Sequence, residues 1–332
     1  MGMNFEKIER AFELLLENVH SLQTYLATNF YDALIEQNSL FLEENPEVDF
    51  VNANNQELRN LDLSAEEWRR TFQFLLMKAS QTEPLQANHQ FTPDAIAFIL
   101  LYLMEQLFEQ DQLELVELGS GTGMLAETLL NHSEKNLDYL GIEVDDLLID
   151  LSASIAEVMK SSAKFAQGDA VRPQIIKESD LILSDLPLGY YPHDQVAERF
   201  QVVAEEGHTY AHHLLIEQGL KYLKKDGYAI YLGPNNLLTS PQSDFFKKWM
   251  QKQADLTALI SLPQDLFASS QQAKSIFIFQ PKQEQASQTF LYALTDLNDQ
   301  AAMLDFRESF ENWKRNKWKI HKTLIYYSSW KR

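Results

Sequence analysis

Short, almost wholly apolar runs alternate with longer amphipathic stretches through the middle of the chain. The runs have the length of buried strands, and the stretches with apolar residues every three or four positions are typical of helices. The predicted strands span 113–118, 139–145 and 165–170, then the first part of 180–192, the residues after a turn at Gly227, 256–263 and 275–280. This regular alternation over residues 86–285 predicts an α/β fold with a doubly wound, mainly parallel, seven-stranded sheet.

The first part of the chain has a helical periodicity instead. The apolar positions that step by three and four residues, and so share one helix face, are Phe5, Ile8, Phe12 and Leu15. We therefore predict a helical N-terminal domain over residues 1–85, which either packs as a cap on the next domain or binds a substrate or partner. The polar stretches 52–56 and 80–88 are the predicted linkers.

Three of the eleven glycines of the chain lie within five positions, at Gly119, Gly121 and Gly123. They fill the junction between a predicted strand and the next helix, where glycine permits positive φ angles and a close approach of backbone to a ligand. Their G-x-G-x-G spacing differs from the dinucleotide fingerprint and from the phosphate loop. Glu117 adds a carboxylate at the strand end, which disfavours a pyrophosphate and suits a cationic ligand. The alternative is a tight turn without a ligand.

Acidic residues also end the next two predicted strands, at Glu143 or Asp145 and at Asp169. Polar groups at the ends of neighbouring strands are what a nucleoside ligand needs, although a single acidic strand end can also be a solvated loop residue. Upstream, Gln90-Phe-Thr-Pro-Asp starts a predicted helix over 96–107, with Thr92 in the position of a cap.

The Gly119-Ser-Gly-Thr-Gly123 junction resembles motif I of the class I S-adenosylmethionine-dependent methyltransferases. The resemblance implies a Rossmann-like methyltransferase fold over residues 86–285 and S-adenosylmethionine as the cofactor. The cofactor-binding residues that it implies are Thr92, Glu117, Gly119, Gly121, Gly123, Glu143, Asp169 and Asp185. Among them, Glu143 rather than Asp145 is expected to bind the ribose hydroxyls, Asp169 the adenine amino group, and Thr92 the methionine end.

The loop Asp185-Leu-Pro-Leu-Gly-Tyr-Tyr191 resembles the Asn-Pro-Pro-Phe-Gly motif of amino-group methyltransferases. The resemblance implies that the Asp185 side chain and the carbonyl of Leu186 accept hydrogen bonds from the attacked NH2 group. Leu186 replaces the first proline of the motif, and Leu188 replaces the aromatic ring that stacks on the target base. The candidate catalytic residues are Asp185, Leu186, Pro187 and Tyr190, with Tyr190 or Tyr191 able to replace the missing ring. The alternative role for Asp185 is a helix cap or turn residue.

Composition narrows the chemistry further. The 332 residues contain no cysteine, which excludes disulfides, thiol catalysis and the thiolate nucleophile of cytosine-C5 methyltransferases. The eight histidines lack metal-ligand spacing, so His212 and His213 are expected to be solvated or packed, and no metal is expected. There is no signal peptide, membrane-spanning run or lipidation motif, so we expect a cytoplasmic protein that does not bind membranes.

The C-terminal extension, residues 286–332, is partly basic and aromatic. Residues 313–322 and 330–332 hold lysine, arginine and tryptophan with no acidic residue among them. This composition is typical of a nucleic-acid contact surface, but it also fits a terminus that packs its tryptophans on the acidic body. A net charge of −20 argues against strong nonspecific binding of nucleic acid.

The resemblance is strongest to the adenine-N6 DNA methyltransferases, including the modification subunits of type I restriction systems. It implies methyl transfer to the exocyclic amino group of adenine in DNA. No region resembles a target-recognition domain, so we expect a protein partner to supply specificity. Two alternatives stay open: a methyltransferase that acts on an RNA base or a protein amide, and a cofactor-binding regulatory protein without catalysis.

Overall fold

The computed structural model describes residues 3–43, 48–85, 92–267, 269–284 and 288–329, with side chains as far as residue 316. Its contacts divide the chain into two compact units. The first unit consists of Met1–Leu101 and Gln110–Ala170, and the second of Tyr102–Glu109 and Val171–Arg332. Helix α5 (Asp94–Leu107) contributes residues to both. The sequence analysis placed domain boundaries at about residues 85 and 285, and these boundaries stay a prediction.

Four helices begin the first unit: α1 (Phe5–Leu26), α2 (Phe30–Leu42), α3 (Asn52–Leu61) and α4 (Ala65–Thr82), with a short 3-10 turn, η1 (Asp49–Val51), before α3. Local side chains fix where three of them start. Asn4 accepts hydrogen bonds from two backbone N–H groups of α1, and Asn29 caps α2 in the same way. Ser64 and Glu67 form a reciprocal capping box at the start of α4.

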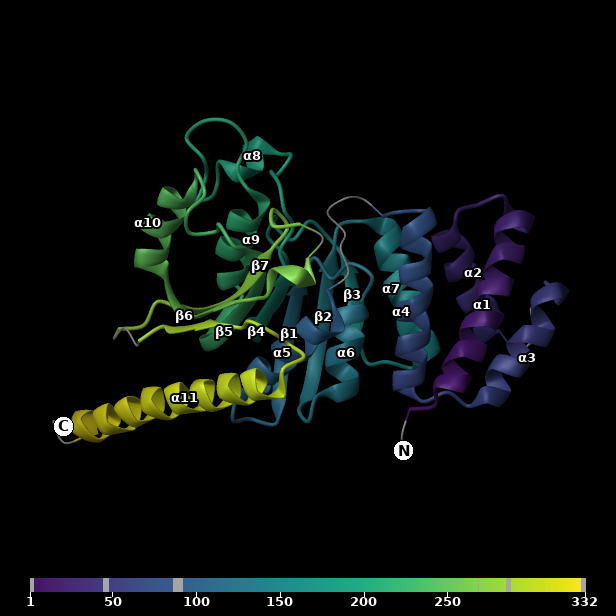
Figure 1. Ribbon diagram of the computed structural model, residues 1–332. Coiled ribbons are helices and arrows are strands. Elements are labelled where there is room, and N and C mark those ends of the chain that lie inside the picture. Colours follow the sequence, from purple (N-terminus) through teal and green to yellow (C-terminus); the bar gives the residue numbers. More distant parts are fainter. Residues whose placement is uncertain (1–2, 44–47, 86–91, 268, 285–287, 330–332) are drawn as a thin grey trace. The chain divides into compact units, whose positions relative to one another are not determined.

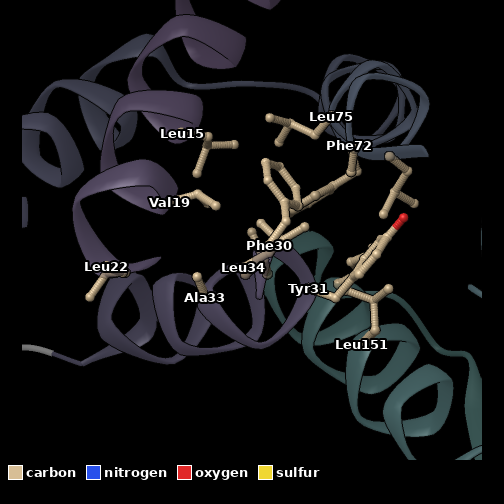
Figure 2. Packing of buried hydrophobic residues seen from close by; sticks show 14 of the residues in the cluster. Leu15, Val19, Leu22, Phe30, Tyr31, Ala33, Leu34, Phe72, Leu75 and Leu151 are labelled. Atoms are coloured by element: carbon tan, nitrogen blue, oxygen red, sulfur yellow. The ribbon is translucent and has the colours of Figure 1, made fainter. Parts of the chain in front are cut away.

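The N-terminal helices share one hydrophobic core with α7 (Asp146–Met159), a helix of the strand-containing part of this unit. Figure 1 shows α4 beside α7, with α1 and α3 farther from α7, and Figure 2 shows Leu15, Phe30, Phe72 and Leu151 among the side chains that pack together. The helical periodicity is confirmed, except that Phe5 is 66% exposed. The helices are therefore packed on the strand-containing part of the unit rather than joined to it by the chain alone.

The predicted linker at 52–56 is wrong, because these residues form the start of α3. Although the sequence of this helix is polar, one side of it is packed. Asn55 is fully buried and binds the buried amides of Asn18 and Gln37. The second predicted linker, 80–88, begins inside α4, and its residues 86–88 lie outside the described residues.

Three parallel strands follow in the first unit: β1 (Gln112–Leu118), β2 (Asn136–Glu143) and β3 (Lys164–Gln167), in the order β3-β2-β1. Helix α6 (Met124–His132) connects β1 to β2, and α7 connects β2 to β3. The alternation of strand and helix is confirmed here. Because the strands are parallel, their carboxyl ends and the loops after them lie along one edge of this sheet.

A buried arginine joins α4 to the two helices that flank this sheet. Arg69 is fully buried, and its guanidinium forms paired hydrogen bonds with Glu66 at 2.7 Å and with Asp94 of α5 at 3.1 Å. It also donates to the Thr128 hydroxyl of α6 at 3.1 Å. His132, the last residue of α6, binds Glu66 as well. One guanidinium thus connects three helices.

The second unit contains five strands: β4 (Ser179–Asp185), β5 (Leu223–Pro234), β6 (Ala254–Ser261), β7 (Lys274–Pro281) and β8 (Phe290–Ala293). Their order is β4-β5-β7-β6-β8, and β7 alone runs antiparallel to its neighbours. The other elements of this unit are α8 (Asp194–Ala197), α9 (Ala211–Leu220), α10 (Ser243–Gln253), η2 (Gln264–Leu266) and α11 (Gln300–Ser329).

The described residues therefore hold eight strands, where the sequence predicted seven. The additional strand, β8, comes from the C-terminal extension and pairs in parallel with β6. The turn predicted at Gly227 is an irregularity within β5, because Leu223 pairs with Ser179 while Tyr228 already pairs with Leu181. A Cβ at position 227 would lie 2.8 Å from the Asp180 carbonyl oxygen, so glycine permits this close approach.

The C-terminal extension is described in part. Trp313 donates its indole N–H to the Gln288 carbonyl at 2.8 Å and packs against Phe290 and Phe310. This tryptophan is packed on its own unit, as the second interpretation of the extension expected. The side chains from residue 317 onward, and all of 330–332, lie outside the described residues. Within the part of the chain that is described, no helix is both long enough and apolar enough to span a bilayer.

We expect Arg69→Met to lower the free energy of unfolding by about 3 kcal/mol, because two partly buried carboxylates lose the fully buried one of the two guanidinium groups, Arg69 and Arg70, that they share. Urea denaturation measures this loss. Arg10→Met is the matched control, since Arg10 also pairs with two glutamates but on an exposed surface, so its loss should be much smaller. Equal losses in the two variants would show that the buried network has no special role.

Candidate active site

The glycine loop between β1 and α6 adopts a conformation that favours glycine at three positions. Gly119, Gly121 and Gly123 have φ angles of 74°, 54° and 77°. A Cβ at Gly119 or Gly121 would meet no atom within 4 Å, so open space lies beside the backbone there. At Gly123 it would lie 2.9 Å from the Phe165 ring. A ligand can therefore approach the backbone closely at Gly119 and Gly121, whereas Gly123 packs tightly against the Phe165 ring.

The end of β2 holds this loop in place. The N–H of Gly119 donates to the Ile142 carbonyl at 2.8 Å, and the N–H of Gly121 donates to the Glu143 carboxylate at 2.9 Å. The same carboxylate accepts hydrogen bonds from the N–H groups of Val144 and Asp145. A carboxylate has about four acceptor positions, so Glu143 retains one for a ligand hydroxyl.

Asp145 and Glu117, the other acidic residues at the ends of β2 and β1, have different surroundings. The Asp145 side chain accepts a hydrogen bond from the Leu148 N–H and caps α7, which agrees with the choice of Glu143 as the candidate ribose ligand. Glu117 is 2% exposed and accepts a 2.6 Å hydrogen bond from the Tyr139 hydroxyl of β2. Burial, and then the Glu117 charge, raise the pKa of Tyr139 well above its usual value. Glu117 therefore supports the inside of the loop.

Two further predicted cofactor residues, Asp169 and Thr92, also belong to the first unit, whereas Asp185 belongs to the second. Gly168, just after β3, donates its N–H to the Glu143 carbonyl at 2.8 Å. Asp169 follows it and is half-buried, so the loop after β3 lies beside the end of β2. Thr92 is half-buried two residues before α5, whereas Phe91 lies outside the described residues. The structure thus brings the glycine loop, Glu143 and the start of the Asp169 loop to one sheet edge.

These residues fit a nucleoside-bearing ligand. The space beside Gly119 and Gly121 admits a ligand to the backbone, and Glu143 retains an acceptor position directly next to that space. Among the described residues there is no group of three or more His, Cys, Asp or Glu side chains placed to bind a metal ion.

The second unit contains the predicted acceptor loop, which follows β4. Leu186 is fully buried, and its N–H donates to the Leu232 carbonyl at 2.9 Å, which extends the pairing of β4 with β5. A proline has no N–H and could not form this bond. Replacement of the first motif proline by leucine therefore adds a hydrogen bond and keeps the carbonyl at position 186.

Lys274 contacts this loop, and the sequence analysis did not identify it. Its ammonium donates to the Asp185 carboxylate and, at 3.0 Å, to the Leu186 carbonyl. Lys274 is 6% exposed and begins β7, where it pairs with Pro234 of β5. No local motif marks this lysine, because only the order of β4, β5 and β7 brings it to the loop. Asp185 is thus an ion-paired residue at the end of a strand.

An exposed aromatic ring does lie on the acceptor loop. Tyr190 is 57% exposed and stacks on Tyr210 with a centroid distance of 4.8 Å and an interplanar angle of 8°. Tyr210 in turn stacks on His212 at 5.0 Å. Tyr191 is buried, so of the two tyrosines considered from the sequence only Tyr190 presents its ring to solvent. The Ala211 N–H donates to the Gly189 carbonyl and attaches the loop to α9.

The two histidines of α9 are buried and uncharged near neutral pH. Burial lowers the pKa of His212 to about 3, and His213 and Lys274 act in the same direction. Burial lowers the pKa of His213 to about 4. His213 stacks on Phe246 of α10. Both rings are therefore packed, which is one of the two placements expected from the sequence.

A further titratable group lies on α6, directly after the glycine loop. Glu127 is 1% exposed, and burial raises its pKa to about 7. The Ser161 side chain and the charge of Arg69 oppose this shift without cancelling it. Glu127 is thus a buried carboxyl that changes its protonation near neutral pH.

Similar proteins share the sequence and the fold. Residues 66–326 match the N-6 DNA Methylase family. The chain is 33% identical to the protein YtxK of Bacillus subtilis (strain 168) over 325 residues, which cover 94% of this chain and 98% of YtxK. A Listeria monocytogenes crystal structure, assigned to the class I S-adenosylmethionine-dependent methyltransferases, matches with a TM-score of 0.85 and 30% identity over 94% of this chain and 100% of that one.

A more distant match shows the fold alone. The methyltransferase subunit of a type I restriction-modification system from Streptococcus thermophilus matches with a TM-score of 0.63 and 13% identity, over 91% of this chain and 74% of that chain. Together with the Listeria structure, it confirms the Rossmann-like methyltransferase fold expected from the sequence.

Glu127→Gln should remove a pH-dependent loss of stability. The folded pKa of Glu127, about 7, is above the usual value for a glutamate, so the folded state binds the proton more tightly and the wild type loses stability as pH rises through this range. Relative to the wild type, the variant should gain about 3 kcal/mol of unfolding free energy between pH 4 and pH 8. Urea denaturation at several pH values measures it. A difference that stays constant with pH would contradict the assignment.

Proposed function

The chain belongs to the N-6 DNA methylase family and is an S-adenosylmethionine-dependent methyltransferase, and on this premise we propose that it methylates the exocyclic amino group of adenine in DNA. The observation that carries the proposal is the pair of acceptor oxygens at the end of β4, the Asp185 carboxylate and the Leu186 carbonyl. An NH2 group has two N–H donors, and this pair of oxygens matches them in number.

The proposed reaction is a direct displacement. S-Adenosylmethionine would supply its methyl group to the amino nitrogen, and loss of the carbon–sulfur bond would leave S-adenosylhomocysteine as a neutral thioether. Hydrogen bonds from the amino group to Asp185 and Leu186 direct the nitrogen lone pair toward the methyl group, so positioning supplies much of the acceleration. The Asp185 carboxylate also stabilises the positive charge that develops on nitrogen. The surplus proton leaves the nitrogen through this carboxylate or water.

We propose that the glycine loop and Glu143 bind the cofactor, which supplies an electrophilic methyl group on a sulfonium. Glu143 accepts one ribose hydroxyl while its three backbone hydrogen bonds keep the carboxylate oriented. Thr92 and Asp169 keep the roles that the resemblance gives them, at the methionine end and the adenine amino group of the cofactor. Glu117 stays a proposed cofactor-binding residue, and its hydrogen bond with Tyr139 supports the loop.

The exposed ring of Tyr190 is proposed to replace the aromatic residue that Leu188 removes from the motif. A target base in duplex DNA must rotate out of the helix, which costs a few kcal/mol of unstacking. Stacking of the base on an aromatic ring offsets about 1–3 kcal/mol of this cost. Tyr190 is supported from behind by Tyr210 and His212, so a base stacked on it extends an existing column of rings.

A protein partner is proposed to supply DNA specificity. The net charge of −20 gives the chain little nonspecific attraction for phosphate. The Streptococcus protein with the same fold is one subunit of a restriction-modification system, which supports an assembly of this kind. A location in the cytoplasm, where DNA and such a partner are present, is part of the same proposal.

Asp185→Ala should lower turnover by about 10²–10⁴ and leave cofactor affinity nearly unchanged, because an orienting group is lost from the acceptor side only. Transfer of labelled methyl from S-adenosylmethionine to separated DNA, RNA and protein fractions measures turnover, and calorimetry measures cofactor binding. Label in the RNA or protein fraction, rather than in DNA, would instead identify an RNA base or a protein amide as the acceptor. Unchanged turnover would remove Asp185 from the site, and cofactor binding without any transfer would favour a regulatory protein.

Tyr190→Ala should raise the KM for the accepting nucleic acid about 10- to 100-fold, in keeping with the loss of one stacked base. Tyr190→Phe is the matched control, because it retains the ring and should retain the KM. Initial rates of methyl transfer at varied acceptor concentration give both values. A normal KM for Tyr190→Ala would show that the base stacks elsewhere.

A further inference from the structure

The two oxygens assigned to the acceptor amino group already have a donor within the chain. The Lys274 ammonium donates to both the Asp185 carboxylate and the Leu186 carbonyl. We call these two oxygens the acceptor position. Lys274 is nearly buried, with 8% of its side chain exposed, and Asp185 has 15% exposed. The contact is therefore a largely dehydrated ion pair, unlike the solvated lysine pairs elsewhere on this unit.

The ammonium resembles an acceptor amino group in its hydrogen bonds but not in its reactivity. It offers N–H donors to the same two oxygens, as an NH2 group does. A protonated amine has no lone pair, so Lys274 in this ion pair cannot attack a methyl group. Bound at the acceptor position, Lys274 thus fills the place of a substrate without being one.

From this geometry we propose that Lys274 is the specificity-determining residue of the acceptor position: an amino group binds there only by displacing the ammonium. The inference rests on the proposed function of Asp185 and Leu186. Hydrogen bonds to charged groups are stronger than those between neutral groups, so a weakly held amine does not compete with Lys274. An acceptor whose other contacts hold it in place, such as a base stacked on Tyr190, can displace it.

The strand arrangement permits this displacement. Lys274 is the first residue of β7, preceded by a loop in which Ala273 accepts a hydrogen bond from the Asn235 N–H. Its long side chain crosses the width of β5 to reach the end of β4, so rotations within the side chain are enough to withdraw the ammonium. On β5, Gly233 lies next to Pro234, the register partner of Lys274, and a Cβ at Gly233 would lie 3.3 Å from Leu186 and from Phe277.

The test compares Lys274→Met with the wild type in labelled methyl transfer from S-adenosylmethionine to unmethylated DNA, with RNA and protein fractions in parallel. The neutral side chain leaves the acceptor position open, so the KM for the accepting fraction should fall at least tenfold, equivalent to about 1.4 kcal/mol. Cofactor affinity should not change. The melting temperature should fall, because Asp185 loses its ion pair.

Two variants serve as controls. Lys274→Arg retains a cation with N–H donors, so it should show no comparable fall in KM. Lys282→Met removes a lysine just after β7 whose ion pair with Asp255 is more exposed, and its KM should equal that of the wild type. If Lys274→Met fails to fold, Lys274→Gln provides a second neutral variant.

The outcomes separate the two ideas. A KM at least tenfold lower in the neutral variant alone supports the inference. A KM equal to or above the wild-type value, with transfer still observed, overturns the inference and leaves the proposed function intact. Cofactor binding without transfer by either protein overturns both. Acetylation of Lys274 in the wild type gives an independent readout: saturating DNA should increase it if the ammonium is displaced, and unchanged acetylation contradicts displacement.

Discussion

A charged group removed from water needs a partner, and this requirement determines much of the structure. Arg69 satisfies it with two carboxylates and a hydroxyl, and thereby joins α4 to α5 and α6. Glu143 satisfies it with three backbone N–H groups, and thereby fixes the glycine loop. Lys274 satisfies it at the end of β4. In each case at least one partner lies on another element or loop, so compensation of charge also determines how the elements of a unit are held together.

The same chemistry distinguishes the two halves of the proposed reaction. On the cofactor side, a carboxylate that is already oriented by the backbone keeps one acceptor position for a neutral hydroxyl. On the acceptor side, a carboxylate is paired with a cation that an incoming amine has to replace. The oriented carboxylate on the cofactor side is ready to bind a ligand hydroxyl. The ion pair on the acceptor side discriminates among ligands, because a ligand has to displace the cation. In the proposed mechanism, the family motif is retained in outline, and a residue outside the motif, Lys274, determines its selectivity.

The departures from the acceptor motif have physical explanations in the fold. Leu186 forms a strand hydrogen bond that proline could not form, and its carbonyl stays in place. Two residues after Leu188, which replaces the aromatic ring of the motif, the exposed ring of Tyr190 stacks on Tyr210. The sequence placed Tyr190 among the candidate catalytic residues and left either Tyr190 or Tyr191 as the ring that replaces the missing one. Only the pairing of this loop with the residues before α9 exposes one ring and buries the other.

Local rules let the sequence alone determine the alternation of strands and helices, the glycine junction and the order of acidic strand ends. Apolar periodicity, positive φ and motif spacing act over a few residues, so they can be read directly. The sequence did not determine α3, whose polar residues bury a network of amides, or β8, which is stabilised by pairing with β6. Nor did it indicate Arg69 as a connection between helices, or Lys274 as a partner of Asp185. These contacts join positions separated by tens of residues, and only the register of strands and the packing of helices bring them together.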